Sequence, residues 1–548
     1  MLEELDLSNI KDESALQLII HLLNLVESLS ADLSAAHQEI QRLRDEVNRL
    51  KGEQGKPLFT PHSSPVSKDH SSESERKTPG THSKQPKNHK VEICREQVLE
   101  VERARLPEDA EFKGYEDVIV QDVVFHTDNI LFHKEKFYSP SQQKTYLATL
   151  PQGYEGQFGP GIKSLIWVLY FASQVSQPKI VELLESVGVF ISAGEVSNLL
   201  IKKQSGLHEE KDEIVRAGLS SSPWQQTDDT ATRVGGQLHH CHVVCNPLYS
   251  GYFTLAKKDR LSVIAALSNQ REPTYLFNEG VIEYLEKLKM SPQVIQEVRL
   301  LPLGEEMNGE EMERKLTERV SRAGRQQRKW IKDGCGVAAY RAQEQLPVVK
   351  LLVCDDAPQM KAITEEIALC WVHDGRHYKK LVPVVSYHRT LLEEFLKEYW
   401  NYYRELLKYQ ENPSLKERER VEKRFDELFA TKTGYEKLDE RIEKTREKKE
   451  GLLIVLKHPE VPLHNNRAEL AVRARVRKRD VSLSAQTEEG VRAWDTGMTL
   501  VETAKKLGVN FYHYIKDRMT GAKQMKSLGE EIKERAKQLR LGESWHSD

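Results

Sequence analysis

Three acidic residues occupy places where their carboxylates could share divalent metal ions. Asp228 ends a short strand-like run, Asp355 ends a longer apolar run, and Glu469 lies at the start of a predicted helix. Hard cations such as Mg²⁺ and Mn²⁺ prefer carboxylate oxygens and retain open water positions. Two such ions held about 4 Å apart activate the attacking oxygen and stabilise the leaving oxygen of a phosphodiester. The three acids therefore predict a two-metal site for phosphoryl transfer.

Asp229 and Asp356, which directly follow the first two acids, are the alternatives for the same two places. Side chains alternate along a strand, so a strand that ends one residue later would turn the other carboxylate toward the site. Acids at strand ends are also commonly nothing more than solvated caps. The spacing of the triad is therefore weak evidence by itself, and the surrounding elements have to support it.

The runs around the first two acids predict the sheet that positions them. Three short runs separated by Gly-Gly and Asn-Pro turns predict an antiparallel meander: 225–228, 239–245 and 251–256. The run 348–354 is almost wholly apolar, as in a central buried strand. Helical spacing dominates 261–345, 389–450 and 465–519. The predicted fold class is α+β, a mixed sheet with large helical insertions.

The helix predicted after Asn465 brings further side chains to the third acid. Asn466, Glu469 and Arg473 are separated by steps of three and four residues, so they share one helix face. Five basic residues follow close together: Arg473, Arg475, Arg477, Lys478 and Arg479. Phosphate contacts supply most of the non-specific affinity for DNA, so this run is predicted to hold a DNA backbone. Within the run, Arg475 is expected to point away from its neighbours.

Apolar residues near the N-terminus predict a coiled coil. Their spacing alternates between four and three residues without a break, and the seam consists of Leu22, Val26, Leu29, Leu33, Ala36, Ile40, Leu43, Val47 and Leu50. Sustained over about four heptads, this pattern favours pairing of helices from two chains. A single amphipathic helix docked on the body of the protein is the alternative for the same pattern.

Between the seam and the sheet, the sequence predicts a linker and a DNA-binding region. Residues 52–90 are rich in Ser, Pro, His and Lys, which predicts a flexible linker. A compact mixed region is predicted from 91 to 222. Within it, a helix over 178–187, a turn at Gly188 and a helix from Ser192 to Lys203 form a candidate helix-turn-helix. Helix pairs of this kind are as common in proteins that do not bind DNA.

Composition limits the class of protein further. Acids and bases nearly cancel in the 548 residues, to a formal net charge of -3, so affinity for a polyanion must come from local basic patches. Six scattered cysteines and the lack of a signal-like start predict a reducing, cytoplasmic setting. The most apolar run, 162–172, is too short for a bilayer, which requires about 20 apolar residues, so no membrane partner is expected.

Four sequence boxes connect the acids to a known family. They are QTDDTATRVGG at 226–236, LLVCDDAPQM at 351–360, CWVHDGRHYKKL at 370–381 and HNNRAELAVRARVRKRD at 464–480. In this order they resemble the boxes of the insertion sequence 66 family of transposases, which are DDE enzymes. The resemblance implies a ribonuclease-H-like catalytic domain in which Asp228, Asp355 and Glu469 are the catalytic acids and the ligands of two Mg²⁺ or Mn²⁺ ions.

The same boxes imply structural residues beside the site. Cys370 and His373 match the family's Cys-Trp-Ala-His box, and Asn465 and Asn466 match its Asp-Asn-Asn element. A zinc site at Cys370 and His373 would need a second short-spaced pair of ligands. A hydrogen bond from His373 near the site is the favoured interpretation. The thiol of Cys370 is expected to be a small buried group rather than a nucleophile.

Three features depart from the family pattern. His464 stands where the family commonly has Asp, and Leu470 stands where it has Arg. Family members often carry a Cys-rich zinc module after the zipper, whereas this chain has only Cys94 there, so the module is expected to be degenerate or free of metal. The substitutions motivate one alternative, a non-catalytic DNA-binding regulator derived from a transposase. A ribonuclease-H-like nuclease without strand transfer is the other alternative.

Together these features predict five regions and their partners. The regions are a coiled-coil helix at 1–52, a linker at 53–90, a DNA-binding region at 91–222, a DDE catalytic domain at 223–519 with helical insertions at about 261–345 and 382–455, and a C-terminal helix and tail at 520–548. The implied activity is cleavage at transposon ends and strand transfer into target DNA. The expected partners are those DNAs, a second copy of the chain and accessory proteins encoded by the element, in the bacterial nucleoid.

Overall fold

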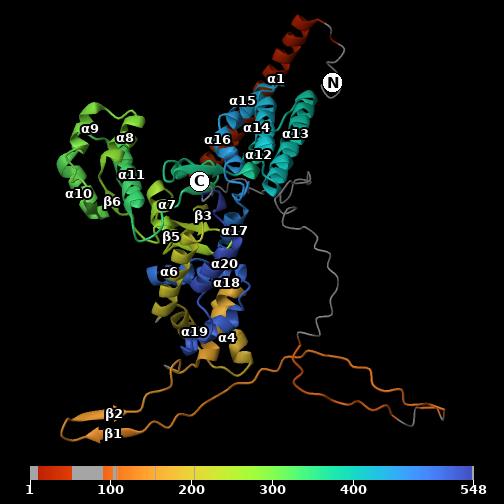
Figure 1. The fold of residues 1–548 in the computed structure, drawn as a ribbon, viewed down its shortest axis with the longest axis vertical. Helices are drawn as coiled ribbons and strands as arrows, with labels where there is room; N and C mark the ends of the chain where they lie inside the picture. The colour runs from red at the N-terminus through yellow and green to blue at the C-terminus, as the bar shows by residue number, and fades with distance from the viewer. Residues whose placement is uncertain are drawn as a thin grey trace.

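The computed structural model describes residues 10, 12–51, 91–102, 106–107, 109–154, 156–202 and 204–545. Figure 1 shows a sheet with helices packed around it, a bundle of helices next to the sheet, a helical lobe to one side and an extended arm. The linker predicted over 53–90 lies outside the described residues.

A five-stranded mixed sheet lies at the centre of the fold. Its strands are β3 (Trp224–Val234), β4 (Gln237–Cys245), β5 (Ser250–Leu255), β8 (Leu351–Cys354) and β9 (Glu366–Leu369). Their order is β5-β4-β3-β8-β9, in which β3, β4 and β5 pair antiparallel and β3, β8 and β9 pair parallel. The predicted α+β class, with its antiparallel meander and mixed sheet, is confirmed.

One strand boundary differs from the prediction. β3 does not end at Asp228 but continues to Val234, because its second half pairs with β4 up to the turn at Gly235 and Gly236. Both glycines have positive φ, as a tight hairpin turn requires. Asp228 therefore lies in the middle of a long strand and not at its end.

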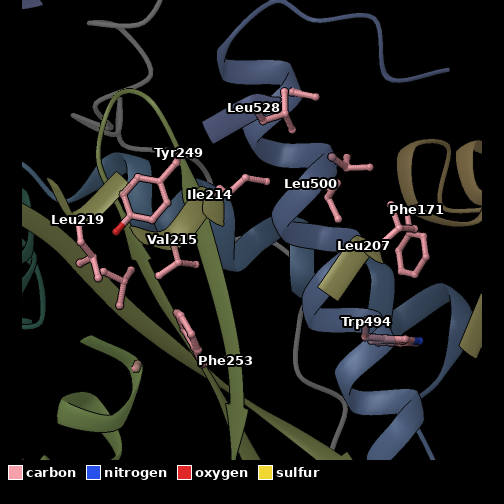
Figure 2. Packing of buried hydrophobic residues seen from close by; sticks show 14 of the residues in the cluster. Phe171, Leu207, Ile214, Val215, Leu219, Tyr249, Phe253, Trp494, Leu500 and Leu528 are labelled. Carbon is pink, nitrogen blue, oxygen red and sulfur yellow. The ribbon is translucent and has the colours of Figure 1, made fainter. Parts of the chain in front are cut away.

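The main hydrophobic core lies between the sheet and a layer of helices. The helices are α3 (Pro160–Trp167), which continues as a π-helix over Val168–Ala172, α6 (Ser205–Ser220), α18 (Glu488–Lys506), α19 (Phe511–Thr520) and α20 (Leu528–Leu539). Figure 2 shows Val215 of α6 and Leu500 of α18 among the core side chains around Tyr249 and Phe253. Gly218 lets the Tyr249 ring approach, because a Cβ there would lie 2.3 Å from the ring.

A second helix layer contacts β4 through its other face. Cys241 and Val243 of β4 form a small core with Ala468 and Ala471. Those two alanines belong to α17 (Asn466–Ser482), the helix that was predicted to carry the third acid. α17 is therefore packed directly against the sheet.

A bundle of helices follows β9, as predicted for the insertion at about 382–455. It consists of α12 (Trp371–Lys379), α13 (Ser386–Glu411), α14 (Leu415–Phe429), α15 (Glu436–Arg446) and the short α16 (Lys449–Leu452), with 3₁₀ turns over Pro358–Met360 before it and Ile454–Leu456 after it. A separate aromatic core, which includes Trp371, Tyr402 and Phe425, holds the bundle together.

A lobe of helices is inserted between β5 and β8. Its elements are α7 (Arg260–Leu267), β6 (Tyr275–Leu276), α8 (Glu279–Lys287), α9 (Pro292–Val298), β7 (Glu306–Met307), α10 (Gly309–Arg319) and α11 (Arg325–Ala342). The predicted helical character of 261–345 is confirmed, with the small β6–β7 sheet as an addition. The lobe has a hydrophobic core of its own and protrudes from the sheet region in Figure 1.

The N-terminal helix α1 (Glu13–Leu50) has two different faces. Leu23, Asn24 and Glu27 are buried against the bundle, so the docked-helix interpretation applies to the first part of the helix. The predicted heptad seam remains exposed, from Leu22 at 49% to Leu50 at 81%. α1 is long and apolar enough to cross a membrane, as some helices of soluble proteins also are. The polar contacts of Asn24 and Glu27 with the bundle indicate a docked helix.

The region predicted to be compact from 91 to 222 is compact only in its second half. The described residues of 91–135 form no helix or strand, and β1 (Lys136–Ser139) and β2 (Lys144–Leu147) form an isolated, exposed hairpin. The prediction is wrong for this arm because its apolar residues do not repeat with a period that builds an amphipathic element. The later helix pair is confirmed as α4 (Gln177–Ser186) and α5 (Ala193–Ile201), with Ser192 accepting the N-cap hydrogen bond.

Candidate active site

Parallel pairing of β3 and β8 aligns the first two acids. Gln226 lies opposite Val353 in the register of the two strands. Continuing that register by two residues sets Asp228 beside Asp355, just beyond the end of β8. Neighbouring strands lie about 4.8 Å apart. The two carboxylates therefore extend from adjacent strands at the same level of the sheet.

The start of α17 is fastened to β3 next to Asp228. The side-chain amide of Asn465 donates to the carbonyl of Thr227 at 2.8 Å, and Gln226 donates to the carbonyl of His464 at 2.8 Å. Asn465 is buried at this junction. Glu469 lies in the first turn of α17, and its backbone N–H donates to the carbonyl of Asn465. The third acid is thus positioned from the same strand that carries the first.

The three acids form one electrostatic cluster. Burial raises the pKa of Asp228 to about 7, and the charges of Asp355, Asp229 and Glu469 raise it as well. The backbone N–H of Asp229, which donates to Asp228 at 2.8 Å, acts in the opposite direction. Since Asp228 responds to both other acids, its ionised form would gain from a cation shared with them.

Cys370 joins the start of α12 to the start of α17. Its sulfur accepts from the backbone N–H of His373 at 3.4 Å and from that of Asn465 at 3.3 Å. Burial raises the pKa of the Cys370 thiol to about 11. The thiol is therefore buried and protonated at neutral pH, and its sulfur links the starts of the two helices.

Two side chains of α12 contact the acids. His373 Nδ1 lies 3.8 Å from Asp355 Oδ2. The guanidinium of Arg376 donates to both carboxylate oxygens of Glu469, each at 3.2 Å. His373 and Arg376 are three residues apart and so project from one helix face. Sequence reasoning missed Arg376, although its spacing from His373 within the same box was a signal that could have found it.

The alternative acids already have lysine partners. Asp229 lies 2.9 Å from the Lys258 ammonium and 3.8 Å from His240 Nδ1. Asp356 lies 2.9 Å from the Lys448 ammonium. Both acids are therefore neutralised by side chains outside the cluster, which favours Asp228 and Asp355 as the residues of the site.

The predicted basic run divides into exposed and buried residues. Arg473 and Arg477 are exposed one turn apart on α17, and Arg479 is partly exposed. Arg475 and Lys478 are buried, so their predicted contacts with DNA are wrong. They lie on the faces of α17 that pack against the protein, because successive residues of a helix point about 100° apart.

The buried pair has internal partners. Arg475 donates to Thr254 Oγ1 at 3.1 Å and lies over the Trp494 ring, 4.4 Å from its centroid. Lys478 donates to the carbonyl of Tyr170 at 2.6 Å and to Ser482. Burial lowers the pKa of Lys478 to about 6. Both residues belong to the core that seats α17.

Asp228, Asp355 and Glu469 offer the carboxylate oxygens that a hard divalent cation prefers, but the three carboxylates do not converge on one point. Among the residues that the structure describes, no three His, Cys, Asp or Glu side chains converge closely enough to hold a metal ion. Both oxygens of Glu469 are bound by Arg376. A metal site built from Asp228, Asp355 and Glu469 therefore requires Glu469 to exchange Arg376 for the metal.

Comparison with known proteins identifies part of the chain. Residues 348–493 match the model of the Transposase IS66 family, a range that contains Asp355 and Glu469 and begins after Asp228. An uncharacterised protein, y4jO, of Sinorhizobium fredii is 29% identical over 318 residues, which cover 56% of this chain and 94% of that protein. No solved structure matches the chain. Residues 348–493 are a transposase domain of the IS66 family, as the sequence boxes predicted.

Proposed function

We propose that this chain is a DDE-type transposase that cleaves DNA at the ends of a mobile element and joins those ends to target DNA. The observation that carries the proposal is geometric: the register of β3 and β8 sets Asp228 beside Asp355, and Asn465 ties the start of α17, which carries Glu469, to β3 next to Asp228. Two of these acids lie within the domain that matches the family. The three come from the strands and the helix start at which a ribonuclease-H-like site is built.

Asp228, Asp355 and Glu469 would hold two Mg²⁺ or Mn²⁺ ions. When bound, such ions activate the attacking oxygen and stabilise the leaving oxygen of the phosphodiester. Asn465 and Cys370 keep the start of α17 against β3 and α12, and so fix where Glu469 lies. Water and then the freed 3′-OH of the DNA act as nucleophiles, so no covalent intermediate with the protein is needed.

Exposed cations on α17 would hold the DNA next to the acids. Arg473 and Arg477 follow Glu469 by one and two helical turns on an exposed face. Phosphate groups bound there would bring the backbone of the DNA past the carboxylates. The buried Arg475 and Lys478 take no part in this contact.

The exposed seam of α1 would pair with the seam of a second copy. It leaves a row of large apolar side chains in water, which coiled-coil pairing would bury. A chain that begins after Gly52 should therefore have a smaller mass in light scattering than the full chain, and should hold two DNA ends together less well than one. Equal masses for both proteins would rule out pairing through α1.

The catalytic proposal is tested with Asp228→Asn, Asp355→Asn and Glu469→Gln in the full-length protein. The amides keep the side-chain shape but lose the charge that holds a metal. Each variant should lose Mg²⁺-dependent cleavage and joining of an element end, with DNA affinity and melting temperature close to those of the wild type. Asp356→Asn is the matched control and should retain cleavage. A triad variant with near-normal turnover does not belong to the site.

The wild-type protein in the same assay separates the proposal from its two alternatives. Nicking without joining of a pre-cut end to a target plasmid would indicate a nuclease. Binding of the element end without any nicking would indicate a regulator. Joining that requires Mg²⁺ or Mn²⁺ supports the transposase.

A further inference from the structure

Positive charge gathers in one segment of the lobe between β5 and β8. The segment 319–332 contains six basic residues and no acid: Arg319, Arg322, Arg325, Arg328, Lys329 and Lys332. It covers the end of α10, a short turn and the first two turns of α11. Exposed acids of the lobe lie on α8 and α10 and also at Glu272, Glu305 and Glu306. The segment 319–332 is therefore a basic stretch without acids in a lobe that otherwise mixes both signs.

Most of these cations hold the lobe together. Four of the six contact carbonyl or carboxylate groups of the lobe itself: Arg319, Arg322, Arg328 and Lys332. Arg325 and Lys329 differ. In the described part of the chain neither forms an ion pair, and both are exposed. They are four residues apart and so project from the same face of α11.

The start of α11 carries cations at the end of the helix dipole that favours negative charge. Its first turn contains no acidic residue, whereas an acid there would stabilise the helix by about 0.3–1 kcal/mol. Arg325 and Arg328 occupy that turn. Cations at the positive end of a helix repel the helix dipole, and a bound anion would remove this cost. Arg325 on this turn and Lys329 on the next are therefore placed to contact a polyanion.

Arg260 fixes α11 relative to the active site. Its guanidinium contacts Asp333 of α11 at 2.7 Å. The same side chain donates to the carbonyls of Pro358 and Lys361, in the loop that follows Asp355. Lys329 precedes Asp333 by one helical turn, a rise of about 6 Å. Arg325 and Lys329 thus lie on a helix whose later turns, at Asp333 and Arg341, are fixed to the loop after Asp355.

The helix pair α4–α5 offers a less suitable surface for DNA. Glu182 and Glu185 are exposed on α4, and Glu195 lies in the first turn of α5. Lys179 and Lys202 are interspersed with these acids. A phosphate backbone lying along this pair would meet as many negative as positive groups.

We propose that Arg325 and Lys329 of α11 contact the phosphate backbone of duplex DNA that leads into the active site. The proposal rests on the proposed function, because the DNA held there is the substrate of the transposase. The lobe is then a second DNA-binding surface, separate from Arg473 and Arg477 of α17.

The test compares two double variants of the full-length protein. Arg325→Gln with Lys329→Gln removes the proposed contacts. Lys287→Gln with Lys289→Gln removes the same charge from exposed positions on the same lobe and is the matched control. Binding to a fluorescent duplex that carries the element end is measured by anisotropy at several salt concentrations. Loss of two phosphate contacts should lower the log–log salt slope by up to about 1.8, while the control keeps the wild-type slope.

Each outcome decides one of the two proposals. A salt slope that is the same in all three proteins overturns the DNA surface on α11, and would suit a protein partner instead. A lower slope in both double variants would show only the effect of net charge and would also overturn it. If the wild-type protein binds the element end but never cleaves it, the proposal of a transposase fails, whereas the proposed DNA contact of α11 still stands. Equal melting temperatures ensure that the comparison concerns folded proteins. The single variant Lys329→Glu should weaken DNA binding more than Lys329→Gln does.

Discussion

Arg376 binds both carboxylate oxygens of Glu469 through its two terminal nitrogens, each at 3.2 Å. Such two-pronged pairs of arginine and carboxylate are among the stronger hydrogen-bonded contacts in proteins. Arg376 therefore supplies positive charge beside the acids in the metal-free protein, and it competes with a metal ion for Glu469.

Replacing Arg376 by Gln should tighten the binding of Mn²⁺ to the metal-free protein, because Glu469 no longer has to give up a partner. A gain of roughly tenfold corresponds to about 1.4 kcal/mol. Isothermal titration calorimetry measures the affinity directly. Arg376→Lys keeps the charge and loses the second hydrogen bond, so its affinity should lie between the two. Unchanged or weaker Mn²⁺ binding by the Gln variant would show that Arg376 does not compete for Glu469.

The pKa of Asp228 predicts how stability changes with pH when metal is absent. The folded protein keeps the Asp228 proton up to a pH of about 7, whereas the unfolded chain releases it near the ordinary value of about 4. The free energy of unfolding should therefore fall as pH rises between these values and change no further above them. Asp228→Asn cannot ionise, so it removes this contribution.

Urea unfolding in the presence of a chelator, from pH 5 to pH 8, measures the difference between the two proteins. Because Asp228 is partly exposed, we expect the Asn variant to be more stable at pH 8 by roughly 1–2 kcal/mol, less than the full shift would give. At pH 5 the advantage should be smaller. A stability difference that does not vary with pH would show that the pKa of Asp228 is not raised in the folded protein.

Sequence patterns predicted the elements of the fold better than the faces of the helices. Periodicity located β8 and α17 because a buried strand and a helix leave clear apolar spacing. Helical spacing predicted that Arg475 points away from Arg473, but only packing against the protein decides that Arg475 is buried rather than solvated. Arg376 was missed for a similar reason, because its partner Glu469 is 93 residues away in the sequence.

The division of the basic run gives two opposite predictions. Arg473→Ala with Arg477→Ala should lower the salt slope of DNA binding by up to about 1.8 and leave the melting temperature unchanged. Arg475→Ala should leave the slope unchanged and cost about 2–3 kcal/mol of stability, because it removes a buried partner of Asp495. Arg475→Met retains contact with the Trp494 ring and should cost less. A fall in the slope for Arg475→Ala would contradict its buried position.

α1 contacts the bundle just before the start of α13. Glu27 of α1 accepts hydrogen bonds from the backbone N–H groups of Val384 and Val385, at 2.7 and 2.9 Å. These groups precede α13, whose N-cap residue Val385 has no side-chain oxygen with which to cap the helix. The Glu27 carboxylate of α1 therefore takes the place of a side-chain cap at the start of α13. α12, whose His373 and Arg376 contact Asp355 and Glu469, ends at Lys379, shortly before α13 begins.

Glu27→Ala should loosen both α1 and the start of α13, because it leaves the N–H groups of Val384 and Val385 without their acceptor, the second of them buried, at a cost of about 1–3 kcal/mol. Hydrogen exchange should become faster at the amides of 384–388, while the amides inside α14 keep their rate. Glu39→Ala is the control, since Glu39 lies on the same helix and forms a solvent-exposed pair with Arg42, which contributes little to stability. If both variants exchange like the wild type, α1 does not cap α13 in solution, and the bundle holds α12 without help from the N-terminal helix.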